Sequence, residues 1–200
     1  MGTLTSAFKL LETSKERFTV DMQDWQDQVN GHWMRLKQHQ ALLSELVKRD
    51  EPLLAAIQDQ KERAKKAVEL SNIRGAKLSK AVDIMSSMSK AFDAQSKAFA
   101  NCDGFETTLD RFKATLKAYD TKGKDTKTKK KAAAEKSLLE AKLLLAQVKK
   151  EKVNDSYQGK GPDQWADVVK AMAKVESLKK KLAETVKGLK GDIAVVDEAK

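Results

Sequence analysis

The chain has 200 residues and a formal net charge of +10, with 6% aromatic and 34% charged residues. That composition is too poor in bulky side chains to fill a compact α/β core. Proline occurs twice and glycine nine times, fewer than a chain with many turns needs. Alanine, leucine, lysine and glutamate are abundant, as in long helices and coiled coils. We therefore predict an all-α protein.

Two further classes are excluded. No run of about 18 apolar residues could form a membrane-spanning helix, and residues 1–18 alternate apolar and charged side chains, unlike a signal peptide. Cys102 is the only cysteine, so neither an internal disulfide nor a thiolate metal cluster can form. We expect a cytoplasmic protein in which this thiol is a small packing residue.

The first helix has the clearest pattern, two rows of residues spaced seven apart from residue 4 to about 49. Such a repeat packs against partner helices by knobs-into-holes contact. The bulky Phe18 and Trp25 favour three or four helices in cross-section. The two rows are Leu4, Leu11, Phe18, Trp25, His32, His39 and Leu46, and Phe8, Lys15, Met22, Val29, Leu36 and Leu43.

Local signals predict where this helix stops and the second begins. Lys48 and Arg49 suit a helix C-terminus, Asp50 can cap a new helix, and Pro52 is tolerated only in a first turn. We expect the second helix over 52–100, ending at the Asn101–Gly104 break. Its predicted buried stripe is Leu53, Ile57, Ala64, Val68, Leu78, Val82, Met85, Met88, Phe92 and Phe99.

The third helix is expected over 104–153, and the fourth over 162–196. The third contains a basic stretch, residues 121–131, that is either a loop or an exposed basic turn of one continuous helix. Residues 154–162 read as a loop, with Pro162 opening the last helix. Short connections make neighbouring helices antiparallel, so we predict a single domain, 1–200, that is an elongated antiparallel helical bundle or coiled coil and forms dimers, since a thin bundle gains from added burial.

No pattern of residues predicts catalysis, a metal site or a cofactor. His32 and His39 are two helical turns apart, about 10 Å, too far to share one ion as an i, i+4 pair does. We interpret them as polar seam residues that fix helix register. Phosphate-binding loops, zinc-protease motifs and nucleophile elbows are all missing from the sequence. We therefore expect a protein that is not an enzyme.

Lysine clusters are the one feature that predicts a binding site. The third quarter of the chain holds most of the excess positive charge. A local excess of this kind suggests a surface for a polyanion. The candidate residues are Lys122, Lys124, Lys127, Lys129, Lys130 and Lys131, and a second group, Lys149, Lys150, Lys152 and Lys160.

The type of residue in the clusters indicates which polyanion is bound. Specific recognition of nucleic acid recruits arginine forks and stacking aromatics, and residues 122–131 contain neither. A diffuse field of lysine suits the smeared charge of an anionic lipid leaflet. We expect an anionic membrane surface as the partner, on the cytosolic side. The alternative is a cytoskeletal or filament-associated scaffold that binds an acidic protein; nucleic acid ranks last.

From about Met85 onward the chain resembles a BAR domain, a dimeric module that bends membranes. Leu116-Lys117-Ala118-Tyr119-Asp120 is similar to the family's Asp-Tyr-Asp stretch. The Lys129–Lys131 run, with the alanines and leucines that follow it to Val148, is similar to its lysine-rich helix. Val153 and Asn154 lie where such a helix reaches its distal tip.

This resemblance implies an antiparallel dimer with a six-helix core that senses or generates curvature. It places the lysines from Lys127 to Lys131 on the lipid-facing surface. It places Lys149, Lys150, Lys152 and Lys160 at the tips.

Overall fold

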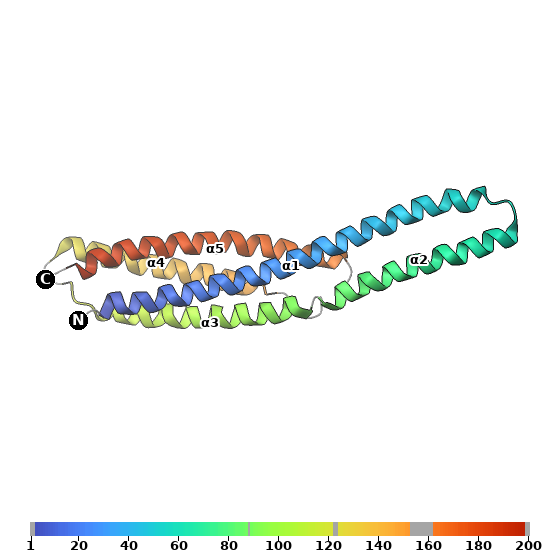
Figure 1. The fold of residues 1–200 in the computed structure, drawn as a ribbon. Coiled ribbons are helices and arrows are strands. Elements are labelled where there is room, and N and C mark those ends of the chain that lie inside the picture. Colours follow the sequence, from blue (N-terminus) through green and yellow to red (C-terminus); the bar gives the residue numbers. More distant parts are fainter. Residues whose placement is uncertain (1–2, 88, 122–123, 153–161, 199–200) are drawn as a thin grey trace. The chain divides into compact units, whose positions relative to one another are not determined.

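The computed structural model describes residues 3–87, 89–121, 124–152 and 162–198, which are helical with short connections and contain no strand. The helices are α1 (Thr3–Ala56), α2 (Gln60–Ser87), α3 (Ser89–Ala118), α4 (Asp125–Lys150) and α5 (Pro162–Asp197) (Figure 1). The all-α prediction is confirmed. Where one domain was expected, the chain divides into two compact units.

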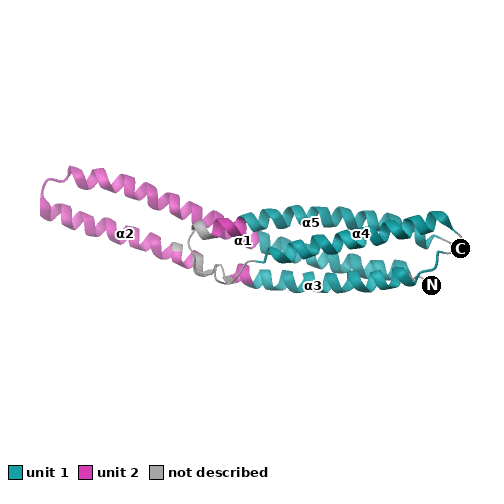
Figure 2. Ribbon diagram, turned by 180° about the vertical axis from the view of Figure 1, so that it is seen from behind, with its two compact units in different colours: residues 1–26, 93–153, 170–200 teal, residues 27–92, 154–169 magenta. Residues whose placement is uncertain are grey.

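Unit 1 comprises residues 1–26, 93–153 and 170–200, and its described part is a four-helix bundle (Figure 2). Aromatic contacts pair α1 with α3: Phe8 with Phe112, and Phe18 with Phe105, both at 5.8 Å between ring centroids. Lysine–carboxylate pairs join the remaining neighbours in the order α3–α4–α5–α1. Residue numbers rise on one helix as they fall on its neighbour, so all neighbours are antiparallel.

The seven-residue rows of the first helix form its buried face, as predicted. None of the thirteen positions is exposed, and Leu4, Leu11 and Phe18 are completely buried. The apolar row that the sequence predicts for the last helix is also buried; it comprises Trp165, Val168, Met172, Val175, Leu182, Val186, Leu189 and Ile193. Sequence periodicity therefore identified the core of these two helices, because burial of a repeated apolar row is what holds long helices together.

The predicted end of the first helix near residue 49 is wrong. Helix α1 continues through Pro52 to Ala56. Because Pro52 has no N–H, the helix loses one backbone hydrogen bond, the one to the carbonyl of Lys48. Asp50 caps nothing: its buried carboxylate pairs with Arg49 and with Arg74 of α2, at 3.1 and 3.3 Å. That pairing keeps residue 50 within the helix.

Asp59 is the residue that starts the second helix. Its side-chain oxygen accepts a 2.8 Å hydrogen bond from the Glu62 backbone N–H, three residues into the helix. The spacing Asp59–Glu62 is that of a capping box, a signal that was visible in the sequence. Arg63 closes the connection by donating to the carbonyl of Leu54 at 2.7 Å.

The predicted break at 101–104 is also wrong. Of the two alternatives left open for residues 121–131, a loop or a turn of one continuous helix, the continuous helix is wrong. Helix α3 runs through Gly104, because Cys102 and Phe105 lie on its completely buried face and packing outweighs the local turn signal. The chain leaves the helix after Ala118 and re-enters one at Asp125. The basic stretch is thus a connection at its start and the first turns of α4 from residue 125; residues 122–123 lie outside the described part.

The predicted stripe of the second helix does not face the core along α2, whereas its last residue, Phe99 of α3, is buried against Trp25. Val68, Leu78 and Val82 are 53–61% exposed. The side of α2 turned toward α1 instead carries Leu70 and Arg74. Met88 and the side chain of Met85 lie outside the described residues.

Unit 2 comprises residues 27–92 and 154–169 (Figure 2). Its main part is a hairpin of two helices, the second half of α1 and α2, which the short connection from Ala56 to Gln60 makes antiparallel and which the Asp50–Arg74 ion pair joins. Trp165, near the start of α5, packs edge-on against Phe92, with 5.8 Å between ring centroids. The loop predicted at 154–162 lies outside the described residues apart from Pro162, the first residue of α5.

Replacing a core ring of unit 1 should destabilise the protein strongly. Phe105→Ala removes a completely buried ring and its stacking on Phe18, so we expect the free energy of unfolding to fall by about 3–5 kcal/mol. Urea denaturation measures this change. Leu10→Ala is the control, because Leu10 is 67% exposed and its loss should change the free energy by less than about 0.5 kcal/mol. Equal losses for the two variants would contradict the assigned core.

Candidate functional site

The predicted lysines fall at the two ends of helix α4. Lys124 directly precedes the helix and is exposed, Lys127 is half-buried and Lys129 is exposed. At the other end Lys150 and Lys152 are exposed. Helix α4 itself carries eight lysines and three carboxylates, whereas the part of α1 in unit 1 carries three basic and four acidic residues. Helix α4 therefore carries the largest positive excess of the bundle, followed by the unit 1 part of α5, which has seven lysines and four carboxylates.

Three of the predicted lysines contact other parts of unit 1 instead of standing free. Lys130 forms a 2.8 Å ion pair with Asp192 of α5. Lys131 donates to the backbone carbonyls of Lys117 and Tyr119, at 3.0 and 2.7 Å, where α3 ends. These two ammonium groups join α4 to its neighbours, so they are less available to an external anion.

Lys149 is the third internal lysine. It pairs with Asp103 at 2.6 Å and also with Glu106, both on α3. Partial burial alone lowers the pKa of Lys149, but hydrogen bonds and negative charge from the two carboxylates outweigh it and hold the pKa above its ordinary value. This side chain serves the α3–α4 contact. Lys122 and Lys160 lie outside the described residues.

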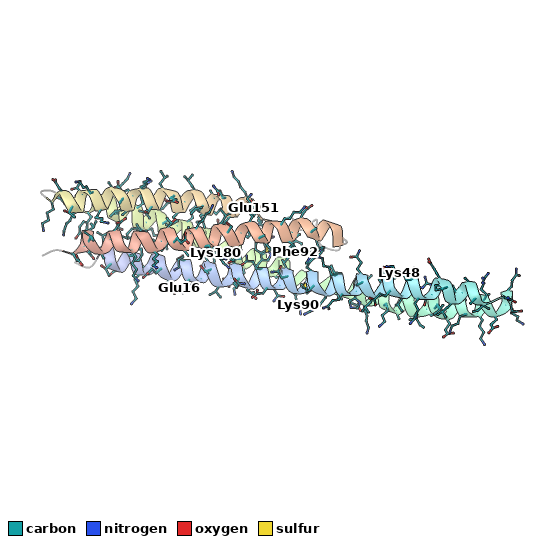
Figure 3. The ribbon with its side chains drawn as sticks, turned by 90° about the horizontal axis from the view of Figure 1, so that it is seen from above. Glu16, Lys48, Lys90, Phe92, Glu151 and Lys180 are labelled. Atoms are coloured by element: carbon teal, nitrogen blue, oxygen red, sulfur yellow. The ribbon has the colours of Figure 1, made fainter. Side chains whose placement is uncertain are left out.

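The lysines that point outward share a face of α4 that the sequence reading missed. We define the outer face of α4 as Lys129, Ala132, Lys136, Leu139, Leu143, Ala146 and Lys150, all of which are exposed. Figure 3 draws the helices with their side chains as sticks and labels Glu151, the residue that follows α4. The positions of the outer face alternate by three and four residues, so they lie along one side of the helix. Glu140 is exposed beside them. The 3–4 spacing was readable from the sequence, but it could not show which of two stripes would be buried.

Two leucines give this face an amphipathic character. Leu139 and Leu143 are 55% and 58% exposed, while Leu138 and Leu145 on the opposite side are buried. Lys136 and Lys150 lie within one to two turns of the leucine pair. At 1.5 Å per residue, the face from Lys129 to Lys150 is about 32 Å long. It therefore offers spaced positive charge around a small apolar centre.

The described residues contain no group of three or more histidine, cysteine or acidic side chains that could hold a metal ion. Within the same ranges, none of the helices is both long and apolar enough to cross a membrane. His32 is buried in unit 2, and burial followed by the charges of Arg35 and Lys90 lowers its pKa.

Cys102 has the environment of a packing residue. Its side chain is completely buried, and burial raises the pKa of the thiol to about 12. We expect thiol reagents to label Cys102 slowly in the native protein and rapidly after unfolding in guanidinium, which absorbance of a released chromophore measures. Rapid labelling of the native protein would contradict this packing.

The same shift predicts a dependence of stability on pH. The folded pKa of about 12 lies above the reference value of 9.0, so the stabilisation is fully present below pH 9 and is lost as pH rises toward 12. Between pH 8 and pH 10 the wild type should therefore lose about 1 kcal/mol more unfolding free energy than Cys102→Ala. Parallel losses in the two proteins would show that the thiol is not shifted.

The comparisons with known proteins identify no family. No protein-family model matches the chain, and no curated protein or solved structure is similar to it at a significant level. The assignment of a role therefore depends on the residues and contacts of the chain itself.

Proposed function

We propose that this protein is a non-enzymatic helical scaffold that binds an anionic membrane surface, on its cytosolic side, through the outer face of α4. The observation that carries the proposal is the combination of Lys129, Lys136 and Lys150 with the exposed Leu139 and Leu143 on one side of one helix. Lys124, Lys127 and Lys152 extend the positive charge beyond its two ends.

The expected binding energy decides which lysines matter. A lysine near an anionic leaflet contributes about 1 kcal/mol, so six of them supply roughly 6 kcal/mol, most of it lost at high salt. Lys130, Lys131 and Lys149 contribute less, because each must first leave its partner in unit 1. The two half-exposed leucines add on the order of 1 kcal/mol each when they leave water, and salt does not screen that part.

The composition of α4 favours lipid over the other polyanions. The helix contains neither arginine nor an aromatic residue, the side chains that read phosphates and bases with defined geometry. Exposed leucines also gain more from a lipid interface than from the highly charged surface of an acidic protein. An acidic cytoskeletal or filament protein remains the alternative partner, and the membrane assay below separates the two.

A BAR-like dimer is the finer form of the proposal. Two copies would present two lysine faces to the same membrane, and linked sites bind far more tightly than either alone. The resemblance through Tyr119, Asp120 and the α4 lysines supports this form, in which the dimer would sense or generate curvature.

Reversing the outward charges should abolish binding to anionic vesicles. For the triple variant K129E/K136E/K150E, we expect affinity for phosphatidylserine-containing vesicles to fall at least about 100-fold, measured by co-sedimentation. Binding of the wild type should weaken as salt rises and be negligible on pure phosphatidylcholine.

The matched control is K48E/K61E/K80E, which changes the net charge equally at three exposed positions of unit 2. It should retain most of the binding. Equal loss in both triple variants would show a response to net charge and no defined face. If the wild type fails to pellet with anionic vesicles at low salt, the membrane proposal is wrong.

A further inference from the structure

The α1–α2 hairpin of unit 2 exposes more apolar surface than the four-helix bundle. Within the described residues, unit 1 has four exposed large apolar side chains, and unit 2 has eight. Exposed apolar side chains that gather on one element mark an interaction surface. The eight in unit 2 are Met34, Leu42, Val47, Leu53, Val68, Ile73, Leu78 and Val82.

Several of them belong to a regular row on α2. We define the hairpin stripe as Ala64, Val68, Ser71, Gly75, Leu78 and Val82, which alternate by four and three residues and are all exposed. No member is charged, although 34% of the chain is. Helix α2 therefore has two rows: one packs against α1, and the other is uncharged and exposed to solvent. This pattern is typical of a helix that packs against other helices on two sides.

Another row of α2 packs against α1 within the hairpin. Leu70 is buried, and Arg74 pairs with the buried Asp50 of α1. In α1, the exposed Val47 follows the seam residue Leu46 by one position, as Ser71 follows the buried Leu70 in α2. Because the helices are antiparallel, these positions lie on the same side of the hairpin. Val47 therefore widens the stripe.

Unit 1 indicates what normally covers these heptad positions. Asp103, Glu106 and Asp110 stand four heptads after Gly75, Leu78 and Val82, and all three meet lysines of α4.

The same relation holds on α1. Gln26 stands three heptads before Val47, and its side chain donates to the Met172 carbonyl of α5 at 3.2 Å. In unit 1 two further helices thus cover the heptad positions that are exposed on the hairpin.

We propose that the hairpin stripe binds the hairpin of a second copy of this chain, so that two helices from each copy form a four-helix bundle around a two-fold axis. This proposal rests on the dimer of the proposed function and assigns it an interface of four helices, in place of the six-helix core that the BAR resemblance implies. A second hairpin supplies the two helices that are needed, and its own bare stripe is covered by the same contact, as in an isologous interface. Since the stripe carries no charge, two basic chains can meet there without repulsion.

The available surface is large enough for a stable dimer. Helix α2 has 28 residues, which at 1.5 Å per residue give a length of about 42 Å. Two helices side by side, about 10 Å apart, present a face roughly 20 Å wide. Each copy can therefore cover roughly 800 Å², the size of a standard specific interface. Ser71 and Gly75 at its centre permit close approach of a partner helix.

The sharpest test uses Gly75. A Cβ built on Gly75 meets no atom within 4 Å, so glutamate fits there in a single chain but would place a charge in the proposed interface. Gly104→Glu is the matched control, because Gly104 is also an exposed helical glycine with open space, in unit 1. Sedimentation equilibrium in the absence of lipid measures the dissociation constant of each protein.

We expect the wild type and Gly104→Glu to form dimers of twice 22.3 kDa, and Gly75→Glu to dissociate at least about 100-fold more readily with unchanged helicity. Leu78→Ser, a milder change, should weaken the dimer without adding charge. A monomeric wild type at high micromolar concentration would overturn the inference, as would equal dimerisation of Gly75→Glu and Gly104→Glu. Dimerisation without vesicle binding would contradict the membrane proposal alone, and vesicle binding by a monomer would contradict this interface alone.

Discussion

A seven-residue apolar repeat is stable only when other helices cover it, and this constraint organises the whole chain. In unit 1 the repeat of α1 is buried against α3 and α5, with Phe18 and Trp25 filling the interior that four helices enclose. Burial of large rings at these positions supplies most of the stabilisation, because lysine–carboxylate pairs at the surface contribute little each. The ion pairs link helices that this burial has already brought together.

Two surfaces of the described helices are not covered by other helices. Each consists of a second row of exposed residues that lies beside the buried row of the same helix. On α4 the second row mixes lysines with Leu139 and Leu143, which suits a charged apolar interface. On α2 it contains no charge, which suits another helix. The two proposals use different helices, α4 for the membrane and the hairpin of α1 and α2 for a second copy, so they are compatible.

Sequence reasoning succeeded where one periodic row dominated and failed where two competed. The seam from Leu4 to Leu36 and the stripe of α5 were predicted correctly, because burial leaves a strong periodic signal. On α2 the more apolar row was assumed to be buried, yet Arg74 and Asp50 place the other row inward. The 101–104 segment misled because packing of Cys102 and Phe105 outweighs the local turn preference, and Pro52 misled because α1 continues through it for a further turn. The internal pairing of Lys130 and Lys149 depends on which helices are neighbours, which no local pattern reveals.

The central claim is that the outer face of α4 meets the lipid, and a depth measurement tests it most directly. A nitroxide label attached at Leu143→Cys should become shielded from a water-soluble relaxation agent and accessible to oxygen when anionic vesicles are added. A label at Leu10→Cys, an equally exposed leucine of α1, should remain in water, and the buried Cys102 thiol should stay unlabelled. A label at residue 143 that stays in water on bound protein, or a label at residue 10 that becomes equally shielded, would contradict the account.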